Sequence, residues 1–220
     1  MSIIAIIPAR GGSKGIPQKN ITPVCGRPLI EWSIKHAKES TKINGVIVTT
    51  DSHAIAEVAI NAGAEVFWRS PETATDTATS ESAIEEVVVK LGLQNDLIVF
   101  LQATSPVRLA TDIDGALATL RLDDATSLFS ARRVEGYVWQ EAGDLLWQRE
   151  SRRPRQQRGI INLEENGSFY VFAANNLLQA HNRLHGQMMA FVQHPFCGYQ
   201  VDEPSDIPIV EVCMRALACT

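Results

Sequence analysis

Residues 3–20 read IIAIIPARGGSKGIPQKN, and they hold the first strong structural signal of this 220-residue chain. The apolar run at 3–7 is typical of a buried strand. The loop that follows contains three glycines and three cations: Gly11, Gly12, Gly15, Arg10, Lys14 and Lys19. Such a loop lets backbone N–H groups approach an anion while the cations neutralise its charge. Although it fits neither G-x-x-x-x-G-K-[ST] nor G-x-G-x-x-G, the stretch predicts a nucleoside triphosphate site.

Short apolar runs and helix-period segments alternate after this loop. The runs predict strands at 3–7, 46–51, 65–68, 97–101 and 126–131. The periodic segments predict helices at 29–41, 54–62 and 82–91, and one from an N-cap at Thr111, with Asp114 completing the capping pattern, to Leu122. The alternation predicts an α/β fold, a Rossmann-like three-layer α/β/α arrangement with a mainly parallel sheet.

In such sheets, ligands bind beyond the carboxyl ends of the strands. Three polar segments fall at those ends: residues 9–20, Asp51 and residues 102–108. We therefore expect these segments to converge on one site.

The second half of the chain changes character after Arg132. Residues 137–147 predict a hairpin, and Asn166-Gly167 predicts a turn before a strand at 168–172. A strand at 188–193 and a last helix from Pro204 complete the core. We interpret the chain as one domain, residues 1–220, with a projecting insertion at about 132–165.

Composition narrows the possible functions. The formal net charge is −5, which disfavours binding to nucleic acid or to an anionic membrane. The four cysteines form no C-x-x-C pair, so neither a zinc site nor a redox motif is indicated. The apolar run at 3–7 is too short for a signal peptide or a membrane span, so we expect a cytoplasmic protein.

Several segments resemble, in order, the signature of the acylneuraminate cytidylyltransferases, which are the CMP-sialic acid synthetases. The matching segments are residues 7–20, 49–51, 69–72, 76–80, 101–108, 155–157 and 165–170. The resemblance covers the chain from Ile3 to about Asp206. It implies that CTP and a nonulosonic 2-keto sugar acid are the substrates, and that the sugar's anomeric hydroxyl attacks the α-phosphate to release pyrophosphate. Positioning and charge neutralisation dominate such a step.

The resemblance also implies roles for individual positions. The implied nucleotide-binding residues are Ala9, Arg10, Gly11, Gly12, Ser13, Lys19, Asn20, Arg69, Ala78 and Ser80. The implied sugar-binding residues are Gln102, Thr104, Ser105, Arg155 and Tyr170. Tyr170 could instead simply close the sheet. The implied catalytic residues are Arg10, Lys19 and Asp202.

Asp202 is the expected Mg²⁺ ligand. The resembled family carries an Asp-x-Asp pair here, whereas this chain has Gln200 at the first position. An amide carbonyl is a weaker Mg²⁺ ligand than a carboxylate, which argues against a two-metal site. One ion on Asp202 and the phosphates, with Asp206 as a further ligand, is the alternative, and the sequence leaves the number of ions open. If metal ligation is deficient, a Gln200→Asp change is expected to keep or raise activity.

The resemblance further implies a homodimer, in which the insertion and Arg155 reach the neighbouring cleft. Three alternatives remain open at this stage. The acid could be another one, such as an octulosonate. The chain could be a nucleotide-binding paralogue with weakened turnover. The arginine cluster at 149–158 could bind RNA, although the acidic net charge counts against this.

Overall fold

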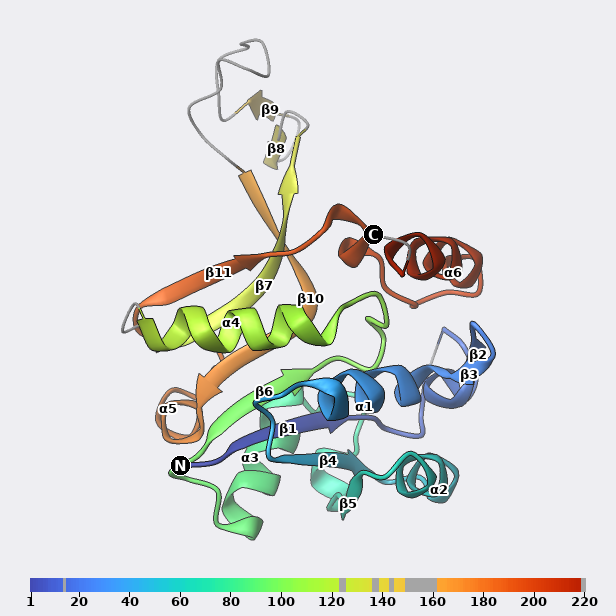
Figure 1. The fold of residues 1–220 in the computed structure, drawn as a ribbon, viewed down its shortest axis with the longest axis vertical. Helices are drawn as coiled ribbons and strands as arrows, with labels where there is room; N and C mark the ends of the chain where they lie inside the picture. The colour runs from blue at the N-terminus through green and yellow to red at the C-terminus, as the bar shows by residue number, and fades with distance from the viewer. Residues whose placement is uncertain (14, 123–125, 136–138, 143–144, 149–161, 219–220) are drawn as a thin grey trace.

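A seven-stranded sheet forms the centre of the protein (Figure 1). The structure is a computed structural model that describes residues 1–13, 15–122, 126–135, 139–142, 145–148 and 162–218. In spatial order the strands are β11 (Met188–Val192), β7 (Ser127–Val134), β10 (Asn162–Ala173), β6 (Leu97–Leu101), β1 (Ile3–Pro8), β4 (Gly45–Thr50) and β5 (Glu65–Trp68). Strands β6, β1, β4 and β5 are parallel, and β10 is antiparallel to both of its neighbours. The prediction of a mainly parallel sheet is confirmed.

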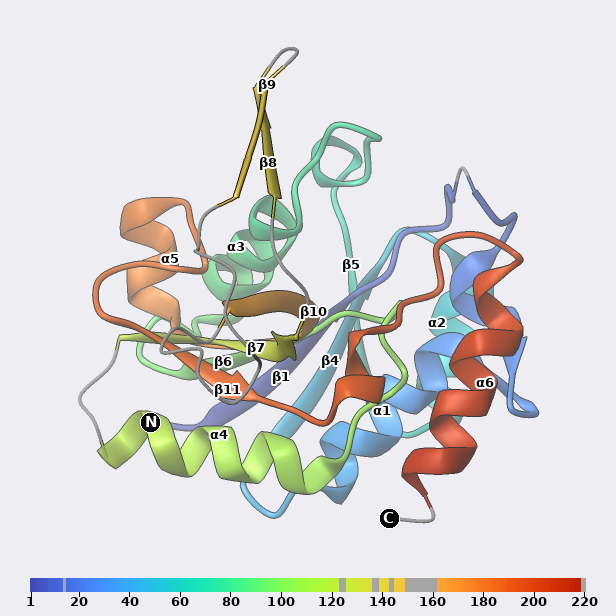
Figure 2. The ribbon, with the colours of Figure 1, turned by 90° about the horizontal axis from the view of Figure 1, so that it is seen from above.

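Helices cover both faces of this sheet, as Figure 2 shows. The helices on the two faces are α1 (Leu29–Glu39), α2 (His53–Asn61), α3 (Ser80–Leu91), α4 (Ala110–Leu122) and α5 (Ala174–Ala180), and a further helix, α6 (Asp206–Leu217), packs elsewhere. Helices α1, α2 and α4 pack on one face, and α3 and α5 pack on the other. Consecutive residues of β1 alternate between the two cores: Ala5 and Ile7 face the first, and Ile6 faces the second. The three-layer prediction is therefore confirmed.

A third apolar cluster joins the last helix to the beginning of the chain. Val210 and Leu217 of α6 pack in this cluster with Ile16, Val24 and Leu29. Two short strands, β2 (Pro23–Val24) and β3 (Arg27–Pro28), and a 3-10 turn, η1 (Lys19–Ile21), lie between the first loop and α1. This packing brings the segment before α6 alongside the loop after β1 (Figure 1).

The predicted capping of α4 is wrong, and α5 was not predicted. Helix α4 begins at Ala110, so Thr111 lies inside the helix and is not its N-cap. The Asp114 carboxylate instead accepts hydrogen bonds from Ser40 and Thr41 at the end of α1. Helix α5 lacks a side-chain cap, and the sequence pattern did not predict it.

Asn166-Gly167 is also not the predicted turn, because it lies inside the twelve-residue strand β10. The pairing of β10 with β7 shifts register between Glu165 and Tyr170, which makes this segment a bulge. Gly167 has φ +66°, a conformation that favours glycine. The buried Asn166 side chain fixes the bulge, because its oxygen accepts from the Ser130 hydroxyl at 2.6 Å.

Strands β7 and β10 continue their pairing beyond the sheet, as far as Val134 and Asn162 (Figure 1). At the far end lies an antiparallel hairpin of β8 (Trp139–Ala142) and β9 (Leu145–Gln148), which confirms the predicted hairpin. Arg155 and the rest of the arginine cluster lie outside the described residues. No helix in the described part of the chain is both long enough and apolar enough to cross a bilayer.

Candidate active site

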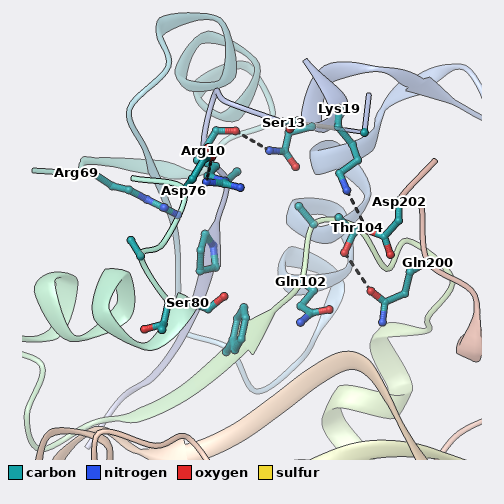
Figure 3. A pocket seen from close by; sticks show the side chains of 18 residues that line it. Arg10, Ser13, Lys19, Arg69, Asp76, Ser80, Gln102, Thr104, Gln200 and Asp202 are labelled. Carbon is teal, nitrogen blue, oxygen red and sulfur yellow. Dashed lines mark hydrogen bonds and ion pairs between the residues drawn. The ribbon is translucent and has the colours of Figure 1, made fainter. Parts of the chain in front are cut away.

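A pocket of about 550 Å³ opens where β1 and β6 end (Figure 3). Four segments that are distant in sequence line it. Its lining residues are Pro8, Ala9, Arg10, Ser13, Gly15, Lys19, Asn20, Arg69, Asp76, Ala78, Thr79, Ser80, Phe100, Gln102, Ala103, Thr104, Gln200 and Asp202. Of the three segments predicted to converge, 9–20 and 102–108 both contribute lining residues, whereas Asp51 does not line the pocket. The segments around 69–80 and 200–202 join them.

Most of the site residues inferred from the sequence line this pocket. They are Ala9, Arg10, Ser13, Lys19, Asn20, Arg69, Ala78, Ser80, Gln102, Thr104 and Asp202. Gly11, Gly12, Ser105 and Tyr170 do not line it, and Arg155 lies outside the described residues. Gly11 instead donates its backbone N–H to the Asp51 carboxylate at 2.7 Å, which ties the loop to the end of β4.

Two cations, Arg10 and Lys19, define what we call the cation end of the pocket. Arg10 Nη1 lies 2.6 Å from Asp76 Oδ1, and Lys19 Nζ lies 2.9 Å from Asp202 Oδ1. The Asp76 and Asp202 side chains are 53% and 68% exposed. Exposed ion pairs contribute roughly 0–1 kcal/mol, so both cations can exchange these partners for a polyphosphate at little cost.

The buried Asn20 amide shapes the loop between these cations. Asn20 Nδ2 donates to the Arg10 carbonyl at 3.0 Å, and the residue is only 6% exposed. Gly15 is needed for a different reason: a Cβ there would lie 2.5 Å from the backbone oxygen of Asp202. The loop therefore packs against the 200–202 segment at a distance that only glycine permits.

Arg69 lies across the pocket from Lys19 (Figure 3). Its Nε donates to the carbonyl and the hydroxyl of Thr49 at 3.1 and 3.2 Å. Burial lowers the pKa of Arg69 to about 10, and the Asp51 carboxylate opposes this shift. Arg69 thus stays cationic at neutral pH and holds a fixed orientation beside Ala78 and Ser80.

Three polar side chains, Gln102, Thr104 and Gln200, define the amide end of the pocket (Figure 3). The Thr104 hydroxyl donates to Gln200 Oε1 at 3.3 Å. Ser105 is fully buried and donates to the Gly167 carbonyl at 3.4 Å, so its hydroxyl supports this end from behind.

Tyr170 closes the sheet instead of lining the pocket, which corrects its expected place among the sugar-binding residues. It is 2% exposed, and its ring stacks on Phe100 at 5.4 Å. Its hydroxyl donates to the Glu165 carboxylate. Burial, followed by that hydrogen bond, raises the pKa of Tyr170.

Sequence reasoning gave no role to Phe100 and Asp76. Phe100 ends the second core at the pocket wall, because its side chain faces that side of β6. Leu101 belongs to the other core, and side chains alternate along a strand. This alternation is the sequence pattern that could have placed Phe100 on the pocket side of β6. Asp76 stands within a segment that matched the family signature, but its pairing with Arg10 depends on a contact across 66 positions.

The donor set suits a magnesium ion that is shared with phosphates. Among the described residues, no group of three or more His, Cys, Asp or Glu side chains is arranged to hold a metal. Mg²⁺ usually takes one or two protein carboxylates and completes its shell with waters and substrate phosphates. The exposed Asp202 carboxylate in the pocket fits that pattern.

The site and the fold are those of a nucleotide-binding α/β protein, and comparisons with known proteins specify the family. The chain belongs to the cytidylyltransferase family, whose model matches residues 4–186.

Two curated relatives and one solved structure illustrate the similarity. The N-acylneuraminate cytidylyltransferase of Oncorhynchus mykiss is 36% identical over 217 residues, which are 95% of this chain and 49% of that protein. The CMP-N,N'-diacetyllegionaminic acid synthase of Legionella pneumophila is 41% identical over 112 residues, 49% of this chain and 48% of that protein. A CMP:2-keto-3-deoxy-manno-octonic acid synthetase solved with CTP has a TM-score of 0.73 at 18% identity and covers 98% of this chain and 99% of its own.

The chain spans about half the length of the first of these relatives, and the match to the second covers about half of each protein. The likeness to the solved synthetase is at the level of the fold. The family resemblance noted in the sequence motifs is nevertheless confirmed by the family model and by the names of the relatives.

Proposed function

We propose that this protein is a cytidylyltransferase that couples CTP to the anomeric hydroxyl of a nonulosonic, sialic-acid-like sugar acid. The observation that carries the proposal is one pocket that is lined both by charged side chains, among them Arg10, Lys19 and Asp202, and by a set of neutral hydrogen-bonding groups. A triphosphate needs the first set, and a polyhydroxylated sugar suits the second. The curated relatives named for acylneuraminate and diacetyllegionaminate support this class of substrate.

Different pocket residues bind different parts of the two substrates. Arg10 and Lys19 bind the triphosphate at the cation end, where they offset the charge that develops as pyrophosphate leaves. Arg69 and Ser80 orient the cytidine, and Gln102 and Thr104 hold the sugar acid. The anomeric oxygen forms a bond to the α-phosphorus while the bond from that phosphorus to the bridging oxygen of the β-phosphate breaks. Pyrophosphate leaves with that oxygen, and the hydroxyl proton passes to solvent water. Holding both substrates in line supplies much of the rate enhancement.

Asp202 would hold Mg²⁺ against the phosphates. When bound, the ion supplies additional charge neutralisation at the triphosphate. Lys19 then serves two partners, since its ammonium lies 2.9 Å from the Asp202 carboxylate and also faces the pocket.

A substrate panel tests the proposal directly. CTP is incubated with nonulosonic and octulosonic acids, and pyrophosphate release is measured; the other three nucleoside triphosphates serve as controls. We expect release only with CTP and a nonulosonic acid. Turnover with an octulosonate alone would move the protein to that substrate class. Calorimetric CTP binding without release for any acid, at any Mg²⁺ concentration, would mean a binding paralogue.

We also propose that the protein is a cytoplasmic homodimer. The pairing of β7 with β10 beyond the sheet gives the projection through which a neighbouring copy would be contacted. In this arrangement Arg155 pairs with the acid's carboxylate in the partner's pocket, because guanidinium binds carboxylate with two parallel hydrogen bonds. Light scattering after size exclusion tests the dimer. Arg155→Ala is expected to raise the KM for the acid and to leave that for CTP unchanged.

A further inference from the structure

We propose that Gln200 is a positioning residue that ties three segments together at the amide end, and that it is not a weakened metal ligand. This inference rests on the proposed function for its substrate readout. Both ends of the Gln200 amide are engaged: Nε2 donates to the Asn166 carbonyl at 2.7 Å, and Oε1 accepts from the Thr104 hydroxyl at 3.3 Å. We call these two hydrogen bonds the amide bridge.

The amide bridge connects segments that share no regular secondary structure. Thr104 belongs to the loop after β6, Asn166 to the bulge of β10, and Gln200 to the segment before α6. The next residue, Val201, donates its backbone N–H to the Thr104 carbonyl at 2.8 Å. The position of Asp202 along the pocket is therefore set by the contacts of Gln200 and Val201.

A buried chain of hydrogen bonds fixes the Asn166 end of the bridge. The Asp112 carboxylate can only accept, so Gln193 turns its Nε2 toward it, at 2.8 Å. The Gln193 carbonyl then faces Asn166 and accepts from its Nδ2 at 3.0 Å. Asn166 and Gln193 are 2% and 5% exposed, so this orientation is not averaged by water.

The hydrogen-bonding partners of Gln200 likewise fix the orientation of its side-chain amide. Because the Asn166 backbone oxygen can only accept, Gln200 must present its N–H₂ there and its carbonyl to Thr104. The Thr104 hydroxyl therefore donates its hydrogen bond to Gln200. Its lone pairs remain available to accept from a hydroxyl of the sugar acid.

Gly167 makes room for this arrangement. A Cβ at that position would lie 2.5 Å from Gln200 Nε2 and 2.7 Å from Gln102 Oε1. The two glutamine side chains thus lie over the bare backbone of the bulge and form a neutral surface for the sugar. A carboxylate at position 200 could not replace the amide, because it has no N–H for the Asn166 carbonyl and would repel it.

Gln200→Glu is the sharpest test, because it keeps the length of the side chain and replaces the N–H₂ donor by a charged oxygen that can only accept. Gln187→Glu is the matched control, since Gln187 is exposed and the charge change is the same. We expect Gln200→Glu to raise the KM for the sugar acid about tenfold or more, with the KM for CTP changed less than about threefold. Gln200→Met tests the loss of the bridge without added charge and should show the same split.

Counting bound metal ions distinguishes the two roles considered for residue 200, a positioning residue and a metal ligand. Mn²⁺ replaces Mg²⁺ on the enzyme–CTP complex, and bound ions are counted by electron paramagnetic resonance. We expect one ion in the wild type and one in Gln200→Asp, whose KM for the acid rises. A second ion in Gln200→Asp together with equal or higher activity would overturn the proposal. An unchanged KM for the acid in Gln200→Glu would do the same.

A measurement without substrate keeps the bridge testable if no acid in the panel reacts. The thermal midpoint of ligand-free Gln200→Glu should lie several degrees below that of Gln187→Glu, because a hydrogen bond to a buried carbonyl is lost. Equal midpoints would refute the amide bridge. A lowered midpoint with no turnover of any acid would refute the proposed function and leave the bridge intact.

Discussion

Lys19 Nζ and Asp202 Oδ1 lie 2.9 Å apart across 183 positions of sequence, and their ion pair joins the loop after β1 to the segment before α6. The Lys19 side chain is 15% exposed, whereas that of Asp202 is 68% exposed. The lysine is therefore held by the protein, and the carboxylate faces the solvent-filled pocket. This asymmetry suits a cation that stays in place and a carboxylate that can also bind a metal.

Arg10→Ala should reduce kcat/KM for CTP by at least about 100-fold, because a cation at the triphosphate is lost. The fold should survive, since the hydrogen bonds of the Arg10 side chain to Asp76 and Thr75, both within the described residues, are exposed. Pyrophosphate release and circular dichroism measure the two effects. Arg27→Ala is the control, because Arg27 forms an exposed ion pair with Glu31 outside the pocket. Near wild-type kcat/KM in Arg10→Ala would refute the triphosphate role.

Asp202→Asn should lower activity by about 100-fold or more and should raise the Mg²⁺ concentration needed for half-maximal rate. The change keeps the shape of the side chain and removes its charge. Thermal stability should change by less than about 1 kcal/mol, because the pair with Lys19 is exposed on the carboxylate side. A Mg²⁺ titration of initial rates measures the effect, with the exposed neighbour Glu203→Gln as control. An unchanged Mg²⁺ requirement would exclude Asp202 as the ligand.

Gly167→Ala should raise the KM for the sugar acid about tenfold or more and destabilise the fold by about 1–3 kcal/mol. The new Cβ would collide with the Gln200 and Gln102 amides, and φ +66° is strained for alanine. Gly92→Ala is a matched control, because Gly92 has φ +71° and nothing lies within 4 Å of the added Cβ. Denaturation and substrate kinetics on both variants separate backbone strain from the pocket effect. Equal KM values for the two variants would contradict the prediction.

His36→Phe should reduce the loss of unfolding free energy that the wild-type protein shows as the pH falls below 6.5. Burial, assisted by the charges of Arg108 and Lys35, lowers the pKa of His36 to about 3 from 6.5. Below pH 6.5 the unfolded chain binds a proton that the folded chain refuses, so stability falls as the pH falls toward 3. The slope approaches about 1.4 kcal/mol per pH unit below pH 6, which amounts to about 2 kcal/mol between pH 6.5 and 4.5.

Urea denaturation at several pH values measures this slope for wild type and for His36→Phe. The exposed His185→Phe is the control and should keep the wild-type profile. The same acid-induced loss in His36→Phe as in the wild type would show that another group causes it.

Much of the fold could be predicted because its signals are local. The continuous apolar runs that became β1, β4 and β6 are short and bounded by loop residues, as strands buried on both faces require. Helix α3 also carries its own boundary signals, with the Thr79 side chain accepting from the Ser82 N–H and Gly92 at its end. The errors arose where a side chain bonds elsewhere, as Asp114 does at the end of α1.

The candidate site could be predicted in part for a similar reason. Motif segments place Arg10, Lys19 and Gln102 at the ends of strands, and parallel strands bring those ends together. Whether a residue near these motifs faces the pocket depends on backbone direction and packing. The Gly11 backbone N–H therefore donates to the Asp51 carboxylate, and the buried Tyr170 ring stacks on Phe100.

The sequence by itself determined the α/β class and the cationic loop, because periodicity and the order of residues are properties of the chain alone. Its motif segments also resemble a cytidyl-transferring family, and the family model confirmed that resemblance. Only the tertiary structure decided what Gln200 does. Read in sequence, it is a missing carboxylate in an Asp-x-Asp pair. In space, its amide joins Thr104 to Asn166 across 96 and 34 positions, because folding brings two loops and the bulge of β10 to one end of the pocket.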